Sequence, residues 1–357
     1  MKVFTTTPLR DLRGTGRLFA ELEAAGYDGG FTYETNHDPF IPLGLAAMDT
    51  TRLRLGTAIA IGFARTPMTL ANVGYDLQEI SEGRFTLGLG SQIRPHIQRR
   101  YSMPWSKPAA RMREMVLGIR AVWDAFDGLT DLDFRGEFYT HTLMTPVFNP
   151  GPHRFGRAPI HVAGVGPRMI EVAAEVADGL ILHPFSTRTS IRSIVVPAIE
   201  RGLARSARLR EDLEVVAVCM IATGATGPEL DAAIEVVRAQ IAFYASTPAY
   251  VPVLACHGWE GLHPALNRLS KEGRWADMAA LVPDEVLETI AIVGRRDEIP
   301  AAVIDRVEGI TDVVSIECTR RPDPDHFGDI VAGIRSLRPA TPGPDPGAVR
   351  SPSPSPR

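Results

Sequence analysis

The sequence predicts an α/β protein folded as a (β/α)₈ TIM barrel. Segments typical of strands and of helices alternate along the chain, and some strand segments are almost wholly apolar, as in residues 53–61 (LRLGTAIAI). Strands that are buried on both faces of a parallel sheet have this composition. Eight such repeats in 357 residues are typical of a barrel. A doubly wound sheet is the alternative, because the pattern alone does not show that the sheet closes.

The strands and helices are placed by periodicity and by the residues that begin or end helices. The strands are expected at residues 2–6, 30–34, 53–61, 85–90, 160–164, 179–183, 213–223 and 312–317. The helices are expected at residues 17–25, 43–50, 67–80, 111–126, 167–177, 190–203, 228–244 and 327–337. The helix at 111–126 has the strongest support, because Met112, Val116 and Trp123 lie on one apolar face.

Two insertions interrupt the repeats. Residues 133–141 (DFRGEFYTH) are expected to form a hairpin, and residues 248–281 a late, largely helical insert. No linker divides the rest of the chain, so we expect residues 1–338 to form a single barrel domain. Residues 339–357 contain seven prolines and almost no core-forming side chains, so we expect this tail to be disordered.

Composition excludes several classes of protein. The 38 basic and 42 acidic residues leave a net charge of −4, which argues against nucleic-acid and membrane-surface partners. The three cysteines, Cys219, Cys256 and Cys318, form no CxxC pair. The sequence shows neither a signal peptide nor an apolar run long enough for a transmembrane helix. We therefore expect a soluble, cytoplasmic protein. No metal site is expected, because neither HExxH nor zinc-ligand spacing occurs.

Catalytic groups of a barrel lie just after the C-terminal ends of its strands. Glu34, His37 and Asp38 follow the second predicted strand. A carboxylate beside an imidazole can form an acid/base pair, so Glu34 and His37 are catalytic candidates. Asp38 precedes Pro39 and is assigned instead to the start of the next helix. His257, in the late insert beside Trp259, is a further catalytic candidate.

Glycine-rich segments follow the fourth and fifth strands. Gly90, Ser91 and Gln92 follow residues 85–89, where a glycine lets a flat ring or a phosphate approach, although a simple turn explains the pattern equally well. After the fifth strand, residues 163–167 (AGVGP) open a helix, and this is the best candidate for a phosphate cradle. The third glycine of the dinucleotide fingerprint is missing, which disfavours NAD. His183 ends the sixth strand.

Several segments, taken in order, resemble the luciferase-like monooxygenase superfamily, and most closely its actinobacterial F420-dependent branch. They are GYDGGFTYETNHDPF, TRLRLGTAIAIGFARTPMTLA, SEGRFTLGLGSQ, FRGEFY, PIHVAGVGPRMIEVAAEVADGLILH and IAIVG. The resemblance covers roughly residues 1–320. One departure concerns the second strand. Many members carry an acidic residue directly followed by His there, whereas this chain has Glu34-Thr35-Asn36-His37.

The resemblance implies a barrel that binds coenzyme F420, or alternatively FMN, across its mouth. It implies a non-proline cis peptide bond at Ala58-Ile59, beneath the ring, although composition alone assigns these residues to the core. It also places a phosphate at the loop after the fifth strand. The residues we assign to the cofactor are Thr57, Ala58, Ile59, Gly90, Ser91, Gln92, Ala163, Gly164, Val165, Gly166, Pro167 and His183.

Three functions follow from the resemblance and the candidate residues. The first is F420-dependent hydride transfer to or from a small organic substrate, with His37 as acid/base oriented by Glu34 and His257 as a second candidate. The second is an FMN-dependent monooxygenase that uses oxygen. The third is a non-catalytic carrier of the flavin or deazaflavin. The expected partner is a small-molecule substrate, and a homodimer is left open.

Overall fold

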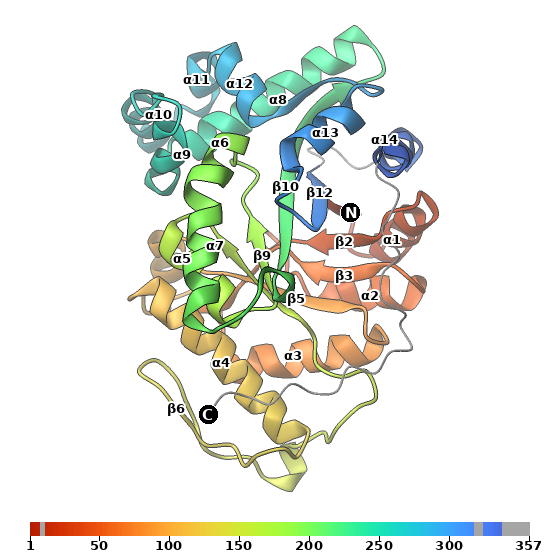
Figure 1. Ribbon diagram of the computed structural model, residues 1–357, viewed down its shortest axis with the longest axis vertical. Helices are drawn as coiled ribbons and strands as arrows, with labels where there is room; N and C mark the ends of the chain where they lie inside the picture. Colours follow the sequence, from red (N-terminus) through yellow and green to blue (C-terminus); the bar gives the residue numbers. More distant parts are fainter. Residues whose placement is uncertain (8–10, 318–323, 338–357) are drawn as a thin grey trace.

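All eight segments that the sequence predicts as strands belong to one parallel sheet. The computed structural model describes residues 1–7, 11–317 and 324–337 (Figure 1). The wall strands are β1 (Lys2–Thr6), β2 (Gly29–Thr32), β3 (Arg54–Thr57), β5 (Phe85–Gly90), β8 (Ile160–Gly164), β9 (Gly179–Leu182), β10 (Glu214–Gly224) and β12 (Val313–Glu317). The tail expected to be disordered, residues 339–357, lies outside the described residues.

These strands close into a ring. Neighbours in the ring pair in parallel, and β12 pairs with β1 while β9 pairs with β10. The fold is therefore a (β/α)₈ barrel and not a doubly wound sheet. Two short strands extend the ring: β4 (Ala60–Ile61) pairs with the end of β5, and β11 (Ile292–Arg295) pairs with the end of β10. The strand β11 was not among the expected ones.

Helices connect the strands on the outside of the ring. They are α1 (Thr15–Ala24), α2 (Ile41–Asp49), α3 (Pro67–Ile80), α4 (Pro108–Phe126), α5 (Pro167–Val176), α6 (Arg188–Ser190), α7 (Val196–Arg205), α8 (Gly227–Ala245), α12 (Asp284–Ile290), α13 (Ile299–Val307) and α14 (Pro324–Leu337). The helix α3 has the predicted bounds. Its first residue is Pro67, and the Thr66 hydroxyl accepts a hydrogen bond from the Thr69 N–H at the helix start.

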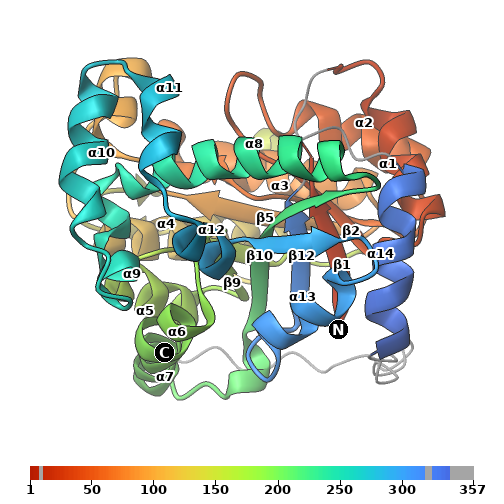
Figure 2. The same ribbon diagram turned by 90° about the horizontal axis from the view of Figure 1, so that it is seen from above.

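The two predicted insertions are present. The short strands β6 (Phe134–Arg135) and β7 (Thr140–His141) pair antiparallel as the expected hairpin. The late insert consists of α9 (Val251–Ala255), α10 (Leu262–Lys271) and α11 (Trp275–Met278), with short 3₁₀ turns on either side. Its buried side chains share an apolar cluster with α8, which packs along β10 (Figure 2). No described helix is long and apolar enough to cross a membrane.

The inside of the barrel is filled by apolar side chains. Alternate residues of a barrel strand point inward. The buried members of the interior cluster are Phe4, Phe31, Ile181, Val216 and Val313. Their chain neighbours Val3, Leu180, Val215 and Val314 face the surrounding helices, as part of the larger core cluster. The barrel is therefore solid below its mouth.

Charged side chains meet at the opposite end of the barrel, where the strands begin. The Arg54 guanidinium makes two hydrogen bonds with the Glu214 carboxylate, at 2.8 and 3.0 Å. Lys2 and His161 lie 3.6 and 3.5 Å from the same carboxylate. His161 is buried, as expected of a core histidine, but its Nδ1 atom has no hydrogen-bond partner in the described part of the chain. Burial lowers the pKa of His161 to about 4, so the ring is neutral at pH 7.

Replacing Glu214 by Gln is expected to lower the free energy of unfolding at pH 7 by about 3 kcal/mol, because Arg54 stays partly buried without its carboxylate. Burial alone would raise the pKa of Glu214, but the hydrogen bonds and charge of Arg54 outweigh it and lower the pKa to about 2. The contribution of Glu214 is therefore complete above pH 4.5 and is lost as the pH falls toward 2. Urea unfolding at pH 7 and pH 3 measures both effects.

The exposed neighbour Glu211 provides the control. We expect Glu211→Gln to leave the stability unchanged at both pH values. An equal loss in the two variants would show that the paired carboxylate at the bottom of the barrel has no special role.

Candidate active site

The mouth of the barrel lies at the C-terminal ends of the strands. Above the buried interior cluster, the partly buried side chains of Ala58, Ile59, Ala163 and Val218 pack against it and form its upper layer. Continuing the inward alternation of β2, β9 and β12 by one more step brings Tyr33, His183 and Glu317 to this level. The mouth thus has an apolar floor with polar side chains around it.

The third strand is interrupted at the mouth. The peptide bond between Ala58 and Ile59 is cis, as the resemblance implied. Just before it, the Thr57 hydroxyl donates to the Gly88 carbonyl at 2.6 Å and accepts from the Gly88 N–H at 2.9 Å. A Cβ atom on Gly88 would lie 1.7 Å from the Thr57 carbonyl oxygen, so only glycine fits there. The hydroxyl of Thr57, predicted to bind the cofactor, thus already donates its hydrogen to the neighbouring strand.

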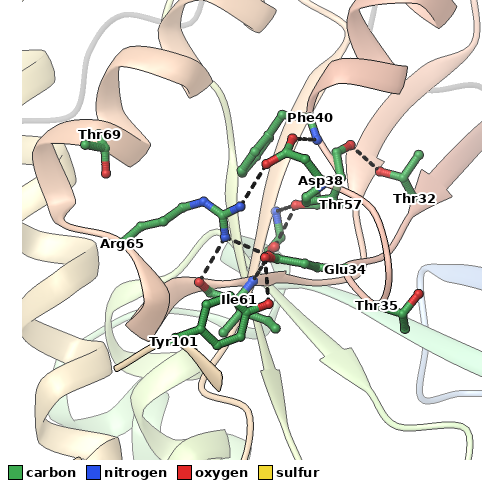
Figure 3. A network of polar contacts seen from close by, with 12 residues as sticks. Thr32, Glu34, Thr35, Asp38, Phe40, Thr57, Ile61, Arg65, Thr69 and Tyr101 are labelled. Carbon is green, nitrogen blue, oxygen red and sulfur yellow. Dashed lines mark hydrogen bonds and ion pairs between the residues drawn. The ribbon is translucent and has the colours of Figure 1, made fainter. Parts of the chain in front are cut away.

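Glu34 is buried at the rim in a network of polar contacts (Figure 3). Its Oε2 atom accepts from the backbone N–H of Ile61 at 2.8 Å and from Arg65 Nη1 at 2.6 Å. Its Oε1 atom accepts from the Tyr101 hydroxyl at 3.1 Å. Both carboxylate oxygens therefore have donors from other segments of the chain, and the side chain ties the end of β2 to the segment after β4.

Arg65 lies between two carboxylates (Figure 3). Its Nη2 atom donates to Asp38 Oδ2 at 3.0 Å, while Asp38 Oδ1 accepts from the backbone N–H groups of Phe40 and Ile41 at the start of α2. The predicted role of Asp38 at the helix start is thus confirmed. Burial alone would lower the pKa of Arg65, but Glu34 and Asp38 outweigh it and raise the pKa above its usual value. The guanidinium remains charged.

The predicted pairing of Glu34 with His37 is not formed. His37 is half-buried, and no hydrogen bond joins the two side chains in the described part of the chain. The reason is that Arg65 and Tyr101, which were not predicted, occupy the Glu34 carboxylate. They follow Glu34 by 31 and 67 residues. Arg65 lies in the segment TRLRLGTAIAIGFARTPMTLA, which contributes to the family resemblance, whereas Tyr101 lies in none of the segments quoted there. Neither residue has a spacing from Glu34 that would have indicated the contact.

The two glycine-rich segments differ in how much free space surrounds their glycines. Gln92 has a positive φ of 58°, and its side chain accepts from the N–H of Ile93. A Cβ atom on Gly90 would lie 2.8 Å from the side chain of Ile59. Gly90 therefore packs closely against Ile59, the second residue of the cis peptide bond.

The loop after β8 leads directly into α5. Gly166 is the N-cap residue, no side chain caps the helix, and Pro167 is its first residue. A Cβ atom on Gly164 would lie 2.9 Å from Ile170, whereas one on Gly166 would meet nothing within 4 Å. The N-terminus of α5 thus has open space before it, which is the arrangement that suits an anion.

His183, directly after β9, and His257, in the late insert, make separate contacts. The Phe185 N–H donates to His183 Nδ1 at 3.1 Å, so the neutral ring carries its proton on Nε2 and donates it to the Tyr250 hydroxyl, 2.9 Å away. Burial lowers the pKa of His183 to about 3. His257 Nε2 lies 2.8 Å from the Thr187 hydroxyl, and its ring stacks on Trp259.

Chemically, the mouth offers hydrogen-bonding and charged groups around an apolar floor. The described residues contain no group of three or more His, Cys, Asp or Glu side chains that could bind a metal ion. Glu317, at the end of β12, is a further polar residue of the mouth that was not predicted as a site residue. The predicted last strand ends at this position, which was a usable signal.

Comparisons with known proteins agree with this architecture. Residues 2–312 match the luciferase-like monooxygenase family. An uncharacterized protein of Mycobacterium tuberculosis is 54% identical over 82% of this chain and 86% of its own length. A 5,10-methylenetetrahydromethanopterin reductase of Archaeoglobus fulgidus is 28% identical over 82% of this chain and 86% of its own. The structure of the coenzyme F420-dependent tetrahydromethanopterin reductase from Methanopyrus kandleri superposes with a TM-score of 0.76 at 21% identity, covering 93% of this chain and 97% of that one.

Replacing Arg65 by Met is expected to lower the free energy of unfolding by about 3 kcal/mol, because Glu34 stays buried without its cation. The double variant Glu34→Gln/Arg65→Met should recover part of this loss, since no uncompensated charge remains. Tyr101→Phe removes one hydrogen bond and should cost about 1 kcal/mol. Urea unfolding of the single and double variants measures the coupling. If the losses of unfolding free energy in Glu34→Gln and Arg65→Met simply added up in the double variant, the pairing of Glu34 with Arg65 would be contradicted.

Proposed function

The chain belongs to the luciferase-like monooxygenase family, and we propose that it is an oxidoreductase that binds coenzyme F420 at the barrel mouth. Its reaction, on this proposal, is hydride transfer to or from a small organic substrate. A relative that is 28% identical is named as a reductase, and a reductase of the same fold is named as F420-dependent. These names support the cofactor without identifying the substrate.

The observation that carries the proposal is the combination of an apolar floor and an open helix N-terminus. Ala58, Ile59 and Ala163 are only partly buried, so an aromatic ring system has a surface on which to lie. Ala163 leads directly into the loop before α5, where Gly166 leaves room for a phosphate. The residues present thus fit a ring with a phosphate-bearing side chain.

The chain's own residues have three roles in this proposal. Residues 163–167, with the N-terminus of α5, hold the phosphate, and Ala58, Ile59 and residues 90–92 support the ring. A bound deazaflavin supplies or takes up a hydride. His37 has no hydrogen-bond partner in the described part of the chain and exchanges the proton that accompanies the hydride. Glu34 is a positioning residue, because its carboxylate is committed to Arg65, Tyr101 and Ile61.

An FMN-dependent monooxygenase is the second candidate, favoured by the name of the matching family. The two proposals differ in the cofactor and in oxygen use. Absorbance titration of the purified protein with F420 and with FMN, followed by gel filtration, tests the difference. We expect F420 to co-elute and FMN not to. Co-elution of FMN together with oxygen consumption would reverse the assignment.

Replacing Gly166 by Asp is expected to weaken F420 binding at least about tenfold, because a carboxylate would occupy the place of the phosphate. Gly227→Asp is the matched control. Gly227 also stands at the start of a helix, and a Cβ atom there likewise meets nothing within 4 Å. Fluorescence titration measures both affinities. Equal affinities in the two variants would place the phosphate elsewhere.

Replacing His37 by Ala is expected to leave F420 binding intact and to lower turnover by roughly 10²-fold or more, the usual effect of losing a general acid/base. The same replacement at His153, which contacts Tyr75 away from the mouth, serves as the control. Stopped-flow absorbance of the cofactor measures turnover. Unchanged turnover in His37→Ala would remove His37 from the mechanism.

A further inference from the structure

The segment that leaves β5 at the mouth carries cations without anionic partners. Residues 91–107 contain no acidic residue. Their three arginines, Arg94, Arg99 and Arg100, are exposed, and none of them makes an ion pair with a described residue. In a chain whose net charge is −4, this segment therefore forms a local patch of positive charge at the rim.

The backbone of this segment has an unusual conformation. His96–Arg100 is a single π-helical turn, and such turns are rare and often occur at functional sites. Gln92 before the turn and Ser102 after it have positive φ angles of 58° and 54°, although neither is glycine. Conformations of this kind cost energy and cluster at sites that bind ligands. Ile97 is buried in the main core cluster, so the turn is anchored while its basic side chains stay exposed.

An open hollow of about 260 Å³ adjoins the turn. It is lined by Pro95, His96, Arg99 and Arg100. Arg100 is held in place, because Nη2 donates to the Thr35 carbonyl after β2 and the guanidinium lies 5.1 Å from the centroid of the Tyr101 ring. Arg99 and His96 have no hydrogen-bond partner in the described part of the chain. Their donors are therefore available to an anionic group in the hollow.

The segment begins beside the loop to which we assign the phosphate. The strands β5 and β8 are paired, with Leu89 next to Val162, so the chain leaves both strands side by side. The contact of Arg100 with Thr35 shows that the π-helical turn extends from there toward the end of β2. A ligand whose phosphate lies at residues 163–167 can therefore continue along the rim to these arginines.

The side chain of F420 continues beyond its phosphate into a chain of glutamates, each of which adds a carboxylate. A guanidinium group binds a carboxylate through two parallel hydrogen bonds. Several exposed cations in one segment suit a chain of carboxylates better than they suit a reacting group, because the reacting part of a ligand would lie deeper, on the apolar floor formed by Ala58, Ile59 and Ala163.

We propose that Arg94, His96 and Arg99 bind the carboxylates of the glutamate tail of F420, and that Arg100 holds the turn in position. This inference rests on the proposed binding of F420 at the mouth. Arg94 uses only Nε, which donates to Gln98, so both of its terminal nitrogens remain for the tail. The turn has no part in proton or hydride transfer, and it therefore sets affinity for the cofactor without setting turnover.

Fluorescence titration with two forms of F420 tests this assignment. One form has no glutamate, and the other carries a tail of several. We expect the wild type to bind the tailed form about tenfold more tightly at low salt. The double variant Arg94→Gln/Arg99→Gln should bind both forms equally, with its affinity for the tail-less form unchanged. Raising NaCl from about 50 mM to about 500 mM should remove the difference in the wild type, because exposed charges are screened.

The double variant Arg52→Gln/Arg154→Gln is the matched control. Both arginines are exposed and make no ion pair with a described residue, and they precede β3 and β8 at the opposite end of the barrel. The control should keep the preference of the wild type. Equal affinities of the wild type for the two forms, or a preference retained in Arg94→Gln/Arg99→Gln, would overturn the proposal.

NMR of the F420-free protein with isotope-labelled histidine gives a readout that does not need the cofactor. A free chain of γ-linked glutamates should shift the His96 ring signals, assigned by their loss in His96→Gln, in the wild type and the control but not in Arg94→Gln/Arg99→Gln. Succinate should shift them much less.

The NMR outcomes separate the anion site from the cofactor. No shift by the glutamate chain would overturn the site, and an equal shift by succinate would overturn the tail in favour of a small acidic substrate. If the wild type binds neither form of F420, the proposed function is refuted, while the shifts of His96 still decide whether the turn binds carboxylates.

Discussion

Closure of eight parallel strands into a ring is the constraint on which the rest of this molecule depends. Because every strand runs in the same direction, all C-terminal ends meet at one mouth. Because side chains alternate, every second residue points into the ring. These two facts together bring Tyr33, Ile59, Ala163, His183 and Glu317 to one place, although they are spread over nearly 290 residues of sequence.

Three carboxylates show how surroundings decide the role of a side chain. Glu214, at the bottom of the barrel, has two hydrogen bonds from Arg54, and its pKa is lowered to about 2. Glu34, at the rim, is held by Arg65, Tyr101 and a backbone N–H. Glu317 has only a neutral amide as donor, and burial raises its pKa to about 7. Arg54 thus lowers the pKa of Glu214, whereas burial without a cationic partner raises the pKa of Glu317.

This contrast changes the interpretation of the rim. Glu34 stands where a sequence-based argument expects an acid/base, but its carboxylate is occupied by contacts from Arg65, Tyr101 and the Ile61 N–H. Its effect on chemistry is then indirect, through the position of the segment that carries Ile59 and Ile61. Membership in the luciferase-like monooxygenase family gives the context of an oxidoreductase, while the individual contacts distinguish positioning residues from candidates for chemistry.

Although α12 and α13 were not among the expected helices, periodicity and composition by themselves determined the barrel strands, most of the outer helices, the hairpin and the helical insert. They did so because an apolar strand or an amphipathic helix is a local property of consecutive residues. The resemblance to the family located the cis peptide bond at Ala58-Ile59, which composition alone assigned to the core. Only the tertiary structure decided the partners of the polar groups. Arg65 and Tyr101 reach Glu34, and Gln240 reaches Glu317, across 31 to 77 residues of chain. Such contacts depend on where the closed ring brings side chains together, and no spacing in the sequence encodes them.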